Sequence, residues 1–356
     1  MKRIAEIDSW RGFLILLVVL GHVTGMACHF CEGEGKRFME CLFKLIYVFH
    51  MPAFFFLAGM TWRRREGECF ITFLGKKARR LLVPYFVFAA LSGVIFYLMS
   101  AQFFSNVAGK QDGYYVAKAP AIIRDMVISM AHAGGWPENG VFRGNSVLWF
   151  LPAMFSAEVI YWIVDRLCPR ARYQLPIVLA LYLSGFFVPA HLPWGLTRAL
   201  NLIAFLAVGR WCAALVRRRM FGAVVALLAA VYCCVCCFTP NHWAAHKSLV
   251  WYVAFDSIAL LGIVVSYKLA EKLVGCTLFQ RLGLAAMGIM LMHKYVVVLL
   301  QTKVVAVSAL CKSGRAGALL AVAGSVVVVL SISYMLAVAV KAMCPWMLGE
   351  RYKSKT

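Results

Sequence analysis

The sequence has few charged residues and very few acidic ones. Only 15% of its 356 residues are charged, and 15 Asp and Glu stand against 37 Lys and Arg, so the formal net charge is +22. Hydrophobic residues make up 63% of the chain, and the mean hydropathy is +0.78. Soluble domains contain about 25% charged residues and about 45–50% apolar ones. This composition therefore excludes a soluble protein and indicates a membrane protein with many spans.

The positive charge is not distributed as in a nucleic-acid-binding protein. Most Lys and Arg lie between apolar runs, where they set the orientation of membrane helices and meet anionic lipids or anionic substrates. We therefore expect membrane lipids among the partners of this chain and no nucleic acid.

The 13 cysteines lack the spacing of a zinc or iron–sulfur site, so we expect no metal and no bound cofactor. Four of them lie within 233–237, inside an apolar run, where packing is the better interpretation. Cys28 and Cys31 flank His29 after the first apolar run. That group leaves two options open, a metal site or, if this face is oxidising, a disulfide.

Ten apolar runs are long enough to cross a membrane, since a spanning helix needs about 20 mainly apolar residues. We expect them at about 12–30, 42–60, 81–104, 147–164, 173–189, 199–216, 221–239, 248–267, 282–301 and 316–340. The first run lacks the small-residue cleavage pattern of a secretory signal and is interpreted as a retained span. No repeat or separate soluble domain interrupts the series. The sequence thus predicts an all-α integral membrane protein with one domain over residues 1–356.

The basic residues predict how these spans are oriented. The most basic loop follows the second span and contains Arg63–Arg65 and Lys76–Arg80. Lys and Arg accumulate in cytoplasmic loops, so this loop and both termini are expected in the cytoplasm. A short polar loop at about 31–40 and the only long loop, at about 105–146, then lie outside. Aromatic residues of the long loop could stack on sugar rings or form an interfacial belt.

The first apolar run carries an acid and a base at its start and a histidine further along. On a helix, Arg11 and His22 are about three turns apart, so they return to nearly the same face with about 16 Å of rise between them. This spacing suits a long ligand with an anionic end at Arg11 and a reactive end at His22, and Asp8 is placed to orient Arg11. The alternative for Arg11 is a plain cytoplasmic anchor. His22 is a functional candidate, because ionisable groups inside membranes are costly.

Other ionisable residues also interrupt the apolar background. His50 falls in the outer half of the second span, and Pro52 loosens the backbone hydrogen bonding nearby, which membrane proteins tolerate where a cavity is lined. Glu158, Asp256 and the adjacent His293 and Lys294 are further candidates for buried functional groups. For Glu158 and Asp256 we favour a structural role, in which they pair with other groups and hold the bundle together.

Five motifs follow one another along the chain. They are Asp8-x-x-Arg11-Gly12 followed by His22, Phe49-His50-Met51-Pro52 with its aromatic continuation to Gly59, Arg79-Arg80-Leu-Leu-Val-Pro84-Tyr85, Leu148-Trp149-Phe150-Leu151-Pro152, and Leu282-Gly283 through His293. Together, in this order, they resemble membrane acyltransferase family 3, and within it the fucose 4-O-acetylase type of sugar O-acetyltransferase. The resemblance extends over most of the chain.

The resemblance implies a ten-helix enzyme that takes an acyl group, usually acetyl, from cytoplasmic acyl-CoA and delivers it to a hydroxyl of a glycan on the far side. The expected acceptor is a glycan or a lipid-linked saccharide, and the expected location is a bacterial cytoplasmic (inner) membrane. The residues expected at the site fall into three groups. They are His22, Arg11 and Asp8 for catalysis; Arg11, Lys76, Arg79 and Arg80 for acyl-CoA; and His50, Trp149, Glu158 and His293 for the acceptor or for support.

The residues by themselves fit this chemistry. Acyl-CoA has a polyanionic end and a pantetheine arm of a length comparable to the Arg11–His22 separation, and a basic cytoplasmic mouth could hold its phosphates. The thioester would then lie beside His22, which we expect to act as general base toward the acceptor hydroxyl. A transient acyl-histidine is the second option.

Two other classes of protein remain open at this point. A proton-coupled transporter of a sugar-like or anionic molecule would also have ten spans with buried histidines and carboxylates. A scaffold of a polysaccharide-synthesising complex could carry histidines without any catalytic role. An acyltransferase should consume acyl-CoA and lose function on His22→Ala while still folding, whereas a transporter should accumulate its substrate along a gradient without acyl-CoA.

Overall fold

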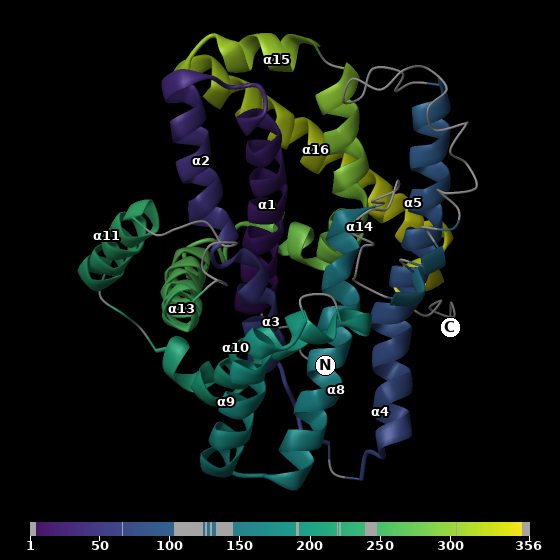
Figure 1. Ribbon diagram of the computed structural model, residues 1–356, viewed down its shortest axis with the longest axis vertical. Coiled ribbons are helices and arrows are strands. Elements are labelled where there is room, and N and C mark those ends of the chain that lie inside the picture. The colour runs from purple at the N-terminus through teal and green to yellow at the C-terminus, as the bar shows by residue number, and fades with distance from the viewer. Residues whose placement is uncertain are drawn as a thin grey trace. The chain divides into compact units, whose positions relative to one another are not determined.

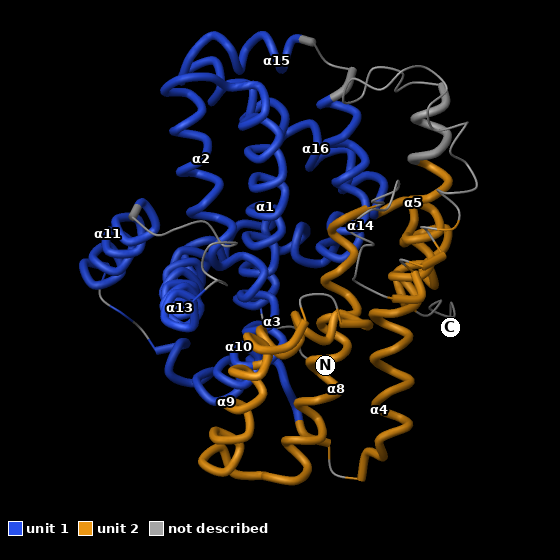
Figure 2. Tube along the Cα trace, viewed as in Figure 1, with its two compact units in different colours: residues 1–63, 204–337 blue, residues 64–203, 338–356 orange. Residues whose placement is uncertain are grey.

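The computed structural model describes residues 5–65, 67–102, 145–189, 192–218, 220, 222–238, 248–303 and 305–350, with six further positions between 124 and 132. All regular elements of these residues are helices (Figure 1), as the predicted all-α class requires. The described chain forms two compact units, residues 1–63 with 204–337 and residues 64–203 with 338–356 (Figure 2). The predicted outer loop at 105–146 lies almost wholly outside the described residues, and the single domain over 1–356 stays a prediction.

Unit 1 is built around the first helix. Its elements are α1 (Ala5–Cys28), α2 (Gly33–Tyr47), α3 (His50–Met60), the second part of α10 (Leu196–Val216), α11 (Gly222–Phe238), α13 (Leu249–Glu271), α14 (Thr277–Lys303), α15 (Val305–Lys312) and most of α16 (Arg315–Met343). The apolar residues of α1 form the centre of this unit. Trp10, Leu14, Ile15 and Val19 are completely buried.

Unit 2 contains the segment that follows the second predicted span. Its elements are α4 (Phe70–Lys77), the π-helical segment η1 (Ala78–Leu82), α5 (Val83–Gln102), η3 (Ser146–Trp149), α8 (Phe150–Leu167), α9 (Ala171–Phe187), η4 (Pro193–Gly195), the first part of α10, the last part of α16 and η5 (Pro345–Leu348). Polar side chains join α8 to α9. Tyr161 O–H donates to Gln174 (3.0 Å), whose amide N–H donates to Asp165 (3.1 Å).

Eight helical segments among the described residues are long and apolar enough to cross a membrane. Helices α9 and α11 form at two of the other predicted spans, but each has 17 residues. At 1.5 Å per residue this corresponds to about 25 Å, shorter than the roughly 30 Å of a hydrocarbon core. An integral membrane protein is therefore supported, while ten spans and cytoplasmic termini remain predictions.

The expected polar loop at about 31–40 is wrong for most of its length, because α2 already begins at Gly33. Its charged residues are spaced so that they occupy one face of the helix, while Met39 and Ile46 are buried. The helix is interrupted at Phe49 (φ −124°, ψ −20°) before α3 begins. Pro52 explains the break, because it has no N–H to donate to the carbonyl four residues earlier.

The basic segment at Lys76–Arg80 is also not a loop. It forms the end of α4 and the start of η1, in which Val83 N–H donates to the carbonyl of Ala78, five residues earlier. Pro84 cannot donate to the carbonyl of Arg80, which fits a wider turn at this point. Such π-helical turns are frequent at functional sites.

Two glycines of the quoted motifs let α1 and α14 come into backbone contact. A Cβ on Gly12 would overlap with the carbonyl oxygen of Phe279, and a Cβ on Gly283 would overlap with that of Asp8. Any larger residue at either position would push the two helices apart. The two glycines thus allow α1 and α14 to pack closely, as small residues do in many membrane helix bundles.

Candidate active site

Four side chains of unit 1 lie around His22 of α1, and they come from three other helices. The Nδ1 atom of His22 on α1 lies 3.1 Å from Tyr47 Oη on α2. The ring of His293 on α14 lies 5.0 Å from the His22 ring, centroid to centroid, and the ring of His50 on α3 lies 4.7 Å from that of Tyr47. Lys294 follows His293 and is half-buried. Sequence analysis predicted the three histidines as site residues, and the structure brings them together.

The glycine crossing explains why His22 and His293 meet. His22 follows Gly12 by ten residues, and His293 follows Gly283 by ten residues. The helices α1 and α14 touch at the two glycines and touch again, ten residues later on each helix, at the two histidines. The two helices therefore run side by side in the same direction between these contacts. Ten residues correspond to about 15 Å of helix. The Asp8–Arg11 end of α1 and the His22 end are thus held by the same pair of helices.

Backbone carbonyls determine which nitrogen carries the proton in two of the three rings. His50 Nδ1 lies 2.9 Å from Ile46 O, and His293 Nδ1 lies 3.0 Å from Ile289 O. A carbonyl can only accept, so both Nδ1 atoms are donors, and in the neutral rings both Nε2 atoms keep a lone pair. The Nε2 atom of His293 is buried and has no hydrogen-bond partner among the described residues. Such an atom is a ready acceptor for a ligand hydroxyl.

The other end of α1 carries the predicted arginine and its partner. Arg11 Nη1 donates to Asp8 Oδ1 at 3.0 Å, and the two side chains are 26% and 14% exposed. Trp10 between them is buried, and its indole N–H donates to Ser266 Oγ (3.2 Å). The ion pair has the geometry expected if Asp8 orients Arg11. The described His, Cys, Asp and Glu side chains include no group of three or more that could hold a metal ion.

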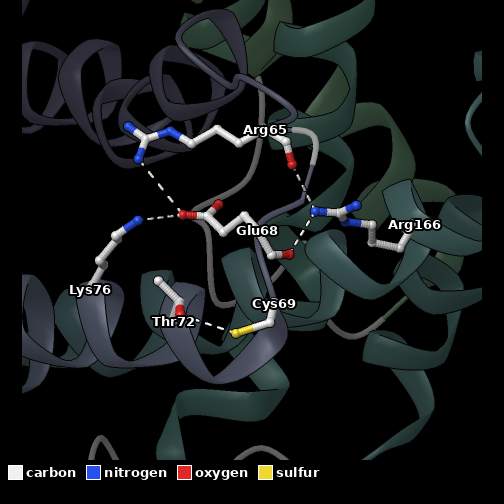
Figure 3. A network of polar contacts seen from close by, with 6 residues as sticks. All are labelled: Arg65, Glu68, Cys69, Thr72, Lys76 and Arg166. Atoms are coloured by element: carbon white, nitrogen blue, oxygen red, sulfur yellow. Dashed lines mark hydrogen bonds and ion pairs between the residues drawn. The ribbon is translucent and has the colours of Figure 1, made fainter.

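The remaining predicted donor-binding residues belong to unit 2. Lys76 Nζ donates to Glu68 Oε1 at 2.7 Å (Figure 3), Arg79 Nη2 lies 3.4 Å from Glu350 O, and Arg80 is exposed. Arg11 belongs to unit 1. A donor site that combines all of these residues therefore stays a prediction.

A polar network holds the segment that leads into α4. Arg166 of α8 donates to the backbone carbonyls of Arg65 and Glu68, both at 2.8 Å (Figure 3). The Arg166 guanidinium also lies 5.1 Å from the centre of the Trp162 ring. The Glu68 carboxylate pairs with Lys76 at 2.7 Å and with Arg65 at 3.7 Å. Much of the charge in this part of unit 2 is thus paired within the unit.

The two predicted acceptor-side residues of unit 2 lie in different surroundings. Glu158, whose side chain is 8% exposed, accepts from Lys77 Nζ at 2.6 Å and thereby joins α8 to α4. This is the kind of pair that the structural interpretation of Glu158 predicts. Trp149 lies in η3, and the Arg198 guanidinium lies 4.3 Å from the centre of its ring.

Sequence reasoning missed Tyr47 and Arg198. Tyr47 precedes His50 by three residues, a spacing that places two side chains on one helix face, and this signal could have found it. The Nη1 atom of Arg198 is buried without a hydrogen-bond partner among the described residues. Arg198 is a charged residue within an apolar run, so the criterion that selected Glu158 and Lys294 applies to it equally.

The motifs and this geometry agree with a comparison with known families. A family model described as an acyltransferase domain matches residues 4–338. The chain belongs to the acyltransferase 3 family. The resemblance inferred from the motifs is thereby confirmed, and the matched residues of this acyltransferase 3 protein include every predicted site residue.

Relatives of this acyltransferase 3 protein occur among the nodulation proteins. Nodulation protein NolL of Mesorhizobium japonicum is 31% identical over 200 residues, which are 54% of this chain and 50% of that protein. Nodulation protein NolL of Sinorhizobium fredii is 35% identical over 88 residues, which are 24% of this chain and 23% of that protein. The chain thus matches no more than half the length of either relative. No solved structure matches it.

Proposed function

We propose that this protein is a membrane-embedded acyltransferase that moves an acyl group, most simply acetyl, from cytoplasmic acyl-CoA to a hydroxyl of a glycan or glycoconjugate at the outer side of the membrane. Membership of the acyltransferase 3 family and the similarity to NolL proteins support the reaction class. The observation that carries the proposal is the cluster of His22, Tyr47 and His293, in which a buried ring nitrogen is left without a partner.

In this proposal His22 is the general base. Its Nδ1–H donates to Tyr47 Oη, which leaves the lone pair on Nε2 free to take the proton of the acceptor hydroxyl. The hydroxyl oxygen attacks the thioester carbonyl, the tetrahedral intermediate collapses, and the CoA thiolate leaves. The proton held on Nε2 then passes to that thiolate, so the histidine returns to its starting state. Tyr47 orients the ring, as a third group does in catalytic triads.

His293 and His50 position the acceptor. The unpartnered Nε2 of His293 accepts from a sugar hydroxyl, which supplies the hydrogen bond that this buried atom lacks in the protein alone. A site built to accept from a hydroxyl discriminates against molecules without one, because the nitrogen would then remain buried and unpaired.

Arg11 and the basic residues of unit 2 act on the donor. The Asp8 carboxylate holds the Arg11 guanidinium in place, and the proposal assigns Arg11 to the anionic part of acyl-CoA. Arg80 is exposed, and Arg79 lies in the π-helical turn, where the backbone departs from regular hydrogen bonding. Guanidinium groups bind phosphate through paired N–H donors, so these two residues suit the nucleotide end of the donor.

The test is consumption of labelled acetyl-CoA by the purified protein in lipid nanodiscs, with a mixture of oligosaccharides as acceptor. We expect binding and turnover by the parent, and loss of turnover in His22→Ala with the amount of folded protein unchanged. His29→Ala is the matched control, since His29 is exposed just beyond the end of α1. Absence of acetyl-CoA binding by the parent would contradict the proposal and favour the transporter.

A further inference from the structure

Two thiol groups from distant parts of the chain touch each other in unit 1. Cys41 Sγ on α2 and Cys237 Sγ near the end of α11 are 3.5 Å apart, although 196 residues separate them in the sequence. All cysteines of the described structure are free thiols. A disulfide requires an S–S distance of about 2.05 Å and a Cβ–Cβ distance of about 3.8 Å. The two sulfur atoms, 3.5 Å apart, are thus about 1.5 Å further apart than in a disulfide.

Both thiols are accessible. Cys237 is exposed and Cys41 is half-buried. Glu40 and Lys44 flank Cys41 on α2, and such charged side chains belong at the headgroup level rather than in the hydrocarbon. We therefore expect an oxidant dissolved in water to reach the pair.

A second thiol pair in the same unit serves as a comparison. Cys31, after α1, and Cys311, in α15, interact through their thiols, but they are 3% and 1% exposed. Because both of these thiols are buried, an oxidant dissolved in water does not reach them. The two pairs thus share proximity and differ in access.

We propose that Cys41 and Cys237 form a disulfide that locks α11 onto α2. The two thiols lose two protons and two electrons, which reduce the disulfide of an oxidant to two thiols, and one S–S bond forms between the helices. The oxidant is a disulfide-bearing molecule, either a small one such as oxidised glutathione or a dithiol oxidase of an oxidising compartment. This proposal does not depend on the acyltransferase chemistry.

The lock acts on the helix that carries Tyr47. Cys41 precedes Tyr47 by six residues on α2, and the α2–α11 interface already includes the Tyr232 hydroxyl, which donates to the carbonyl of Leu45. Tyr232 also packs edge-on against Phe49, with ring centroids 5.8 Å apart. A covalent link at Cys41 fixes this interface at a second point and closes a loop of 196 residues, which constrains the unfolded chain. Oxidation should therefore raise the unfolding temperature.

The experiment uses the full-length protein in nanodiscs, treated with oxidised glutathione, quenched with N-ethylmaleimide under denaturing conditions and digested without reductant. We expect one cross-linked peptide pair that contains Cys41 and Cys237, and a melting temperature several degrees higher than before treatment. Cys31 and Cys311 should both be recovered as alkylated peptides.

Three variants decide between this pair and its neighbours. Cys41→Ser and Cys237→Ser should each abolish the cross-link, whereas Cys234→Ser, a matched change at an exposed thiol of α11, should retain it. Recovery of both Cys41 and Cys237 as fully alkylated peptides from the oxidised parent would overturn the proposal. A cross-link of Cys41 to another cysteine of α11 would also overturn it. Because the parent alone gives this readout, the result does not depend on the folding of any variant.

Discussion

The buried groups that were predicted as acceptor-side residues are paired differently in the two units of this protein. In unit 1 the group around His22 is enclosed by α1, α2, α3 and α14, and it leaves the Nε2 atom of His293 buried and unpaired. In unit 2 the buried Glu158 carboxylate is paired with Lys77, and Arg166 donates to two backbone carbonyls. A protein fold tolerates an unsatisfied buried atom at a cost of about 1–3 kcal/mol. The comparison suggests that chemistry resides in unit 1, whereas much of the charge in unit 2 supports the fold.

The largest expected effect on stability is in unit 2. Glu158→Gln should lower the free energy of unfolding by about 3 kcal/mol, because it removes the buried carboxylate that pairs with the Lys77 ammonium at 2.6 Å. Thermal unfolding in nanodiscs measures this. Acetyl transfer per folded molecule should change by less than about twofold if the pair is structural. A loss of transfer at unchanged stability would instead place Glu158 in the acceptor site. The contrast between unit 1 and unit 2 would then be wrong for this residue.

In unit 1 the removal of a hydroxyl should affect the reaction and not the fold. Tyr47→Phe should reduce kcat about tenfold, since loss of one hydrogen bond to His22 is worth about 1.4 kcal/mol. The matched control is Tyr232→Phe, which removes a hydroxyl from the same unit but outside the histidine group. Equal effects of the two changes on kcat would contradict the orienting role of Tyr47.

His293→Phe should give a smaller loss of transfer and no loss of stability. The change removes the buried Nε2 atom that has no partner together with the hydrogen bond from Nδ1 to Ile289 O, so the two effects offset each other and the melting temperature should stay nearly the same. Transfer should fall about fivefold, with the effect in KM for the acceptor, because one neutral hydrogen bond to the sugar is lost. A clear drop in melting temperature with unchanged acceptor KM would show that His293 is a packing residue.

The smallest expected effect is on the alkylation of Cys69, which precedes the basic segment and reports the side of the membrane on which that segment lies. Cys69 is exposed, and its hydrogen bond with Thr72 (3.0 Å, Figure 3) lowers the pKa of the Cys69 thiol. The thiolate is the reactive form, so alkylation of Cys69 should persist as the pH falls from about 9 to about 7 more than alkylation of the exposed Cys276 does. An impermeant maleimide should reach both only from the cytoplasmic side. Labelling of Cys69 from the outside would contradict the proposed topology.

Sequence reasoning correctly predicted the helical class and the family, and it singled out three histidines that the structure brings together, because each of these features has a local signal. Apolar length predicts spans, and a proline such as Pro52 marks the break that sets His50 at the start of α3. It was wrong at two helical segments that contain many charged residues. The charged part of α2 and the basic end of α4 were both predicted as loops. Lys and Arg are concentrated in the loops of membrane proteins only on average, and these two segments are exceptions.

The sequence around His22 does not by itself reveal which residues from distant parts of the chain contact it. The equal spacing from Gly12 to His22 and from Gly283 to His293 is visible in the sequence, but its meaning requires knowing that α1 and α14 cross at the two glycines. Arg198 was passed over, although it is a charge within an apolar run, and only the structure shows that it stacks on Trp149.

The measurement that tests the account most directly compares the two units in one assay. Steady-state transfer from labelled acetyl-CoA would be recorded for His22→Ala in unit 1 and Arg80→Gln in unit 2. The account predicts that His22→Ala lowers kcat by about 100-fold or more with little change in KM for the donor. Arg80→Gln should raise the donor KM several-fold at nearly constant kcat. If His22→Ala retained the kcat of the parent while folding normally, the central claim that His22 is the base would be contradicted.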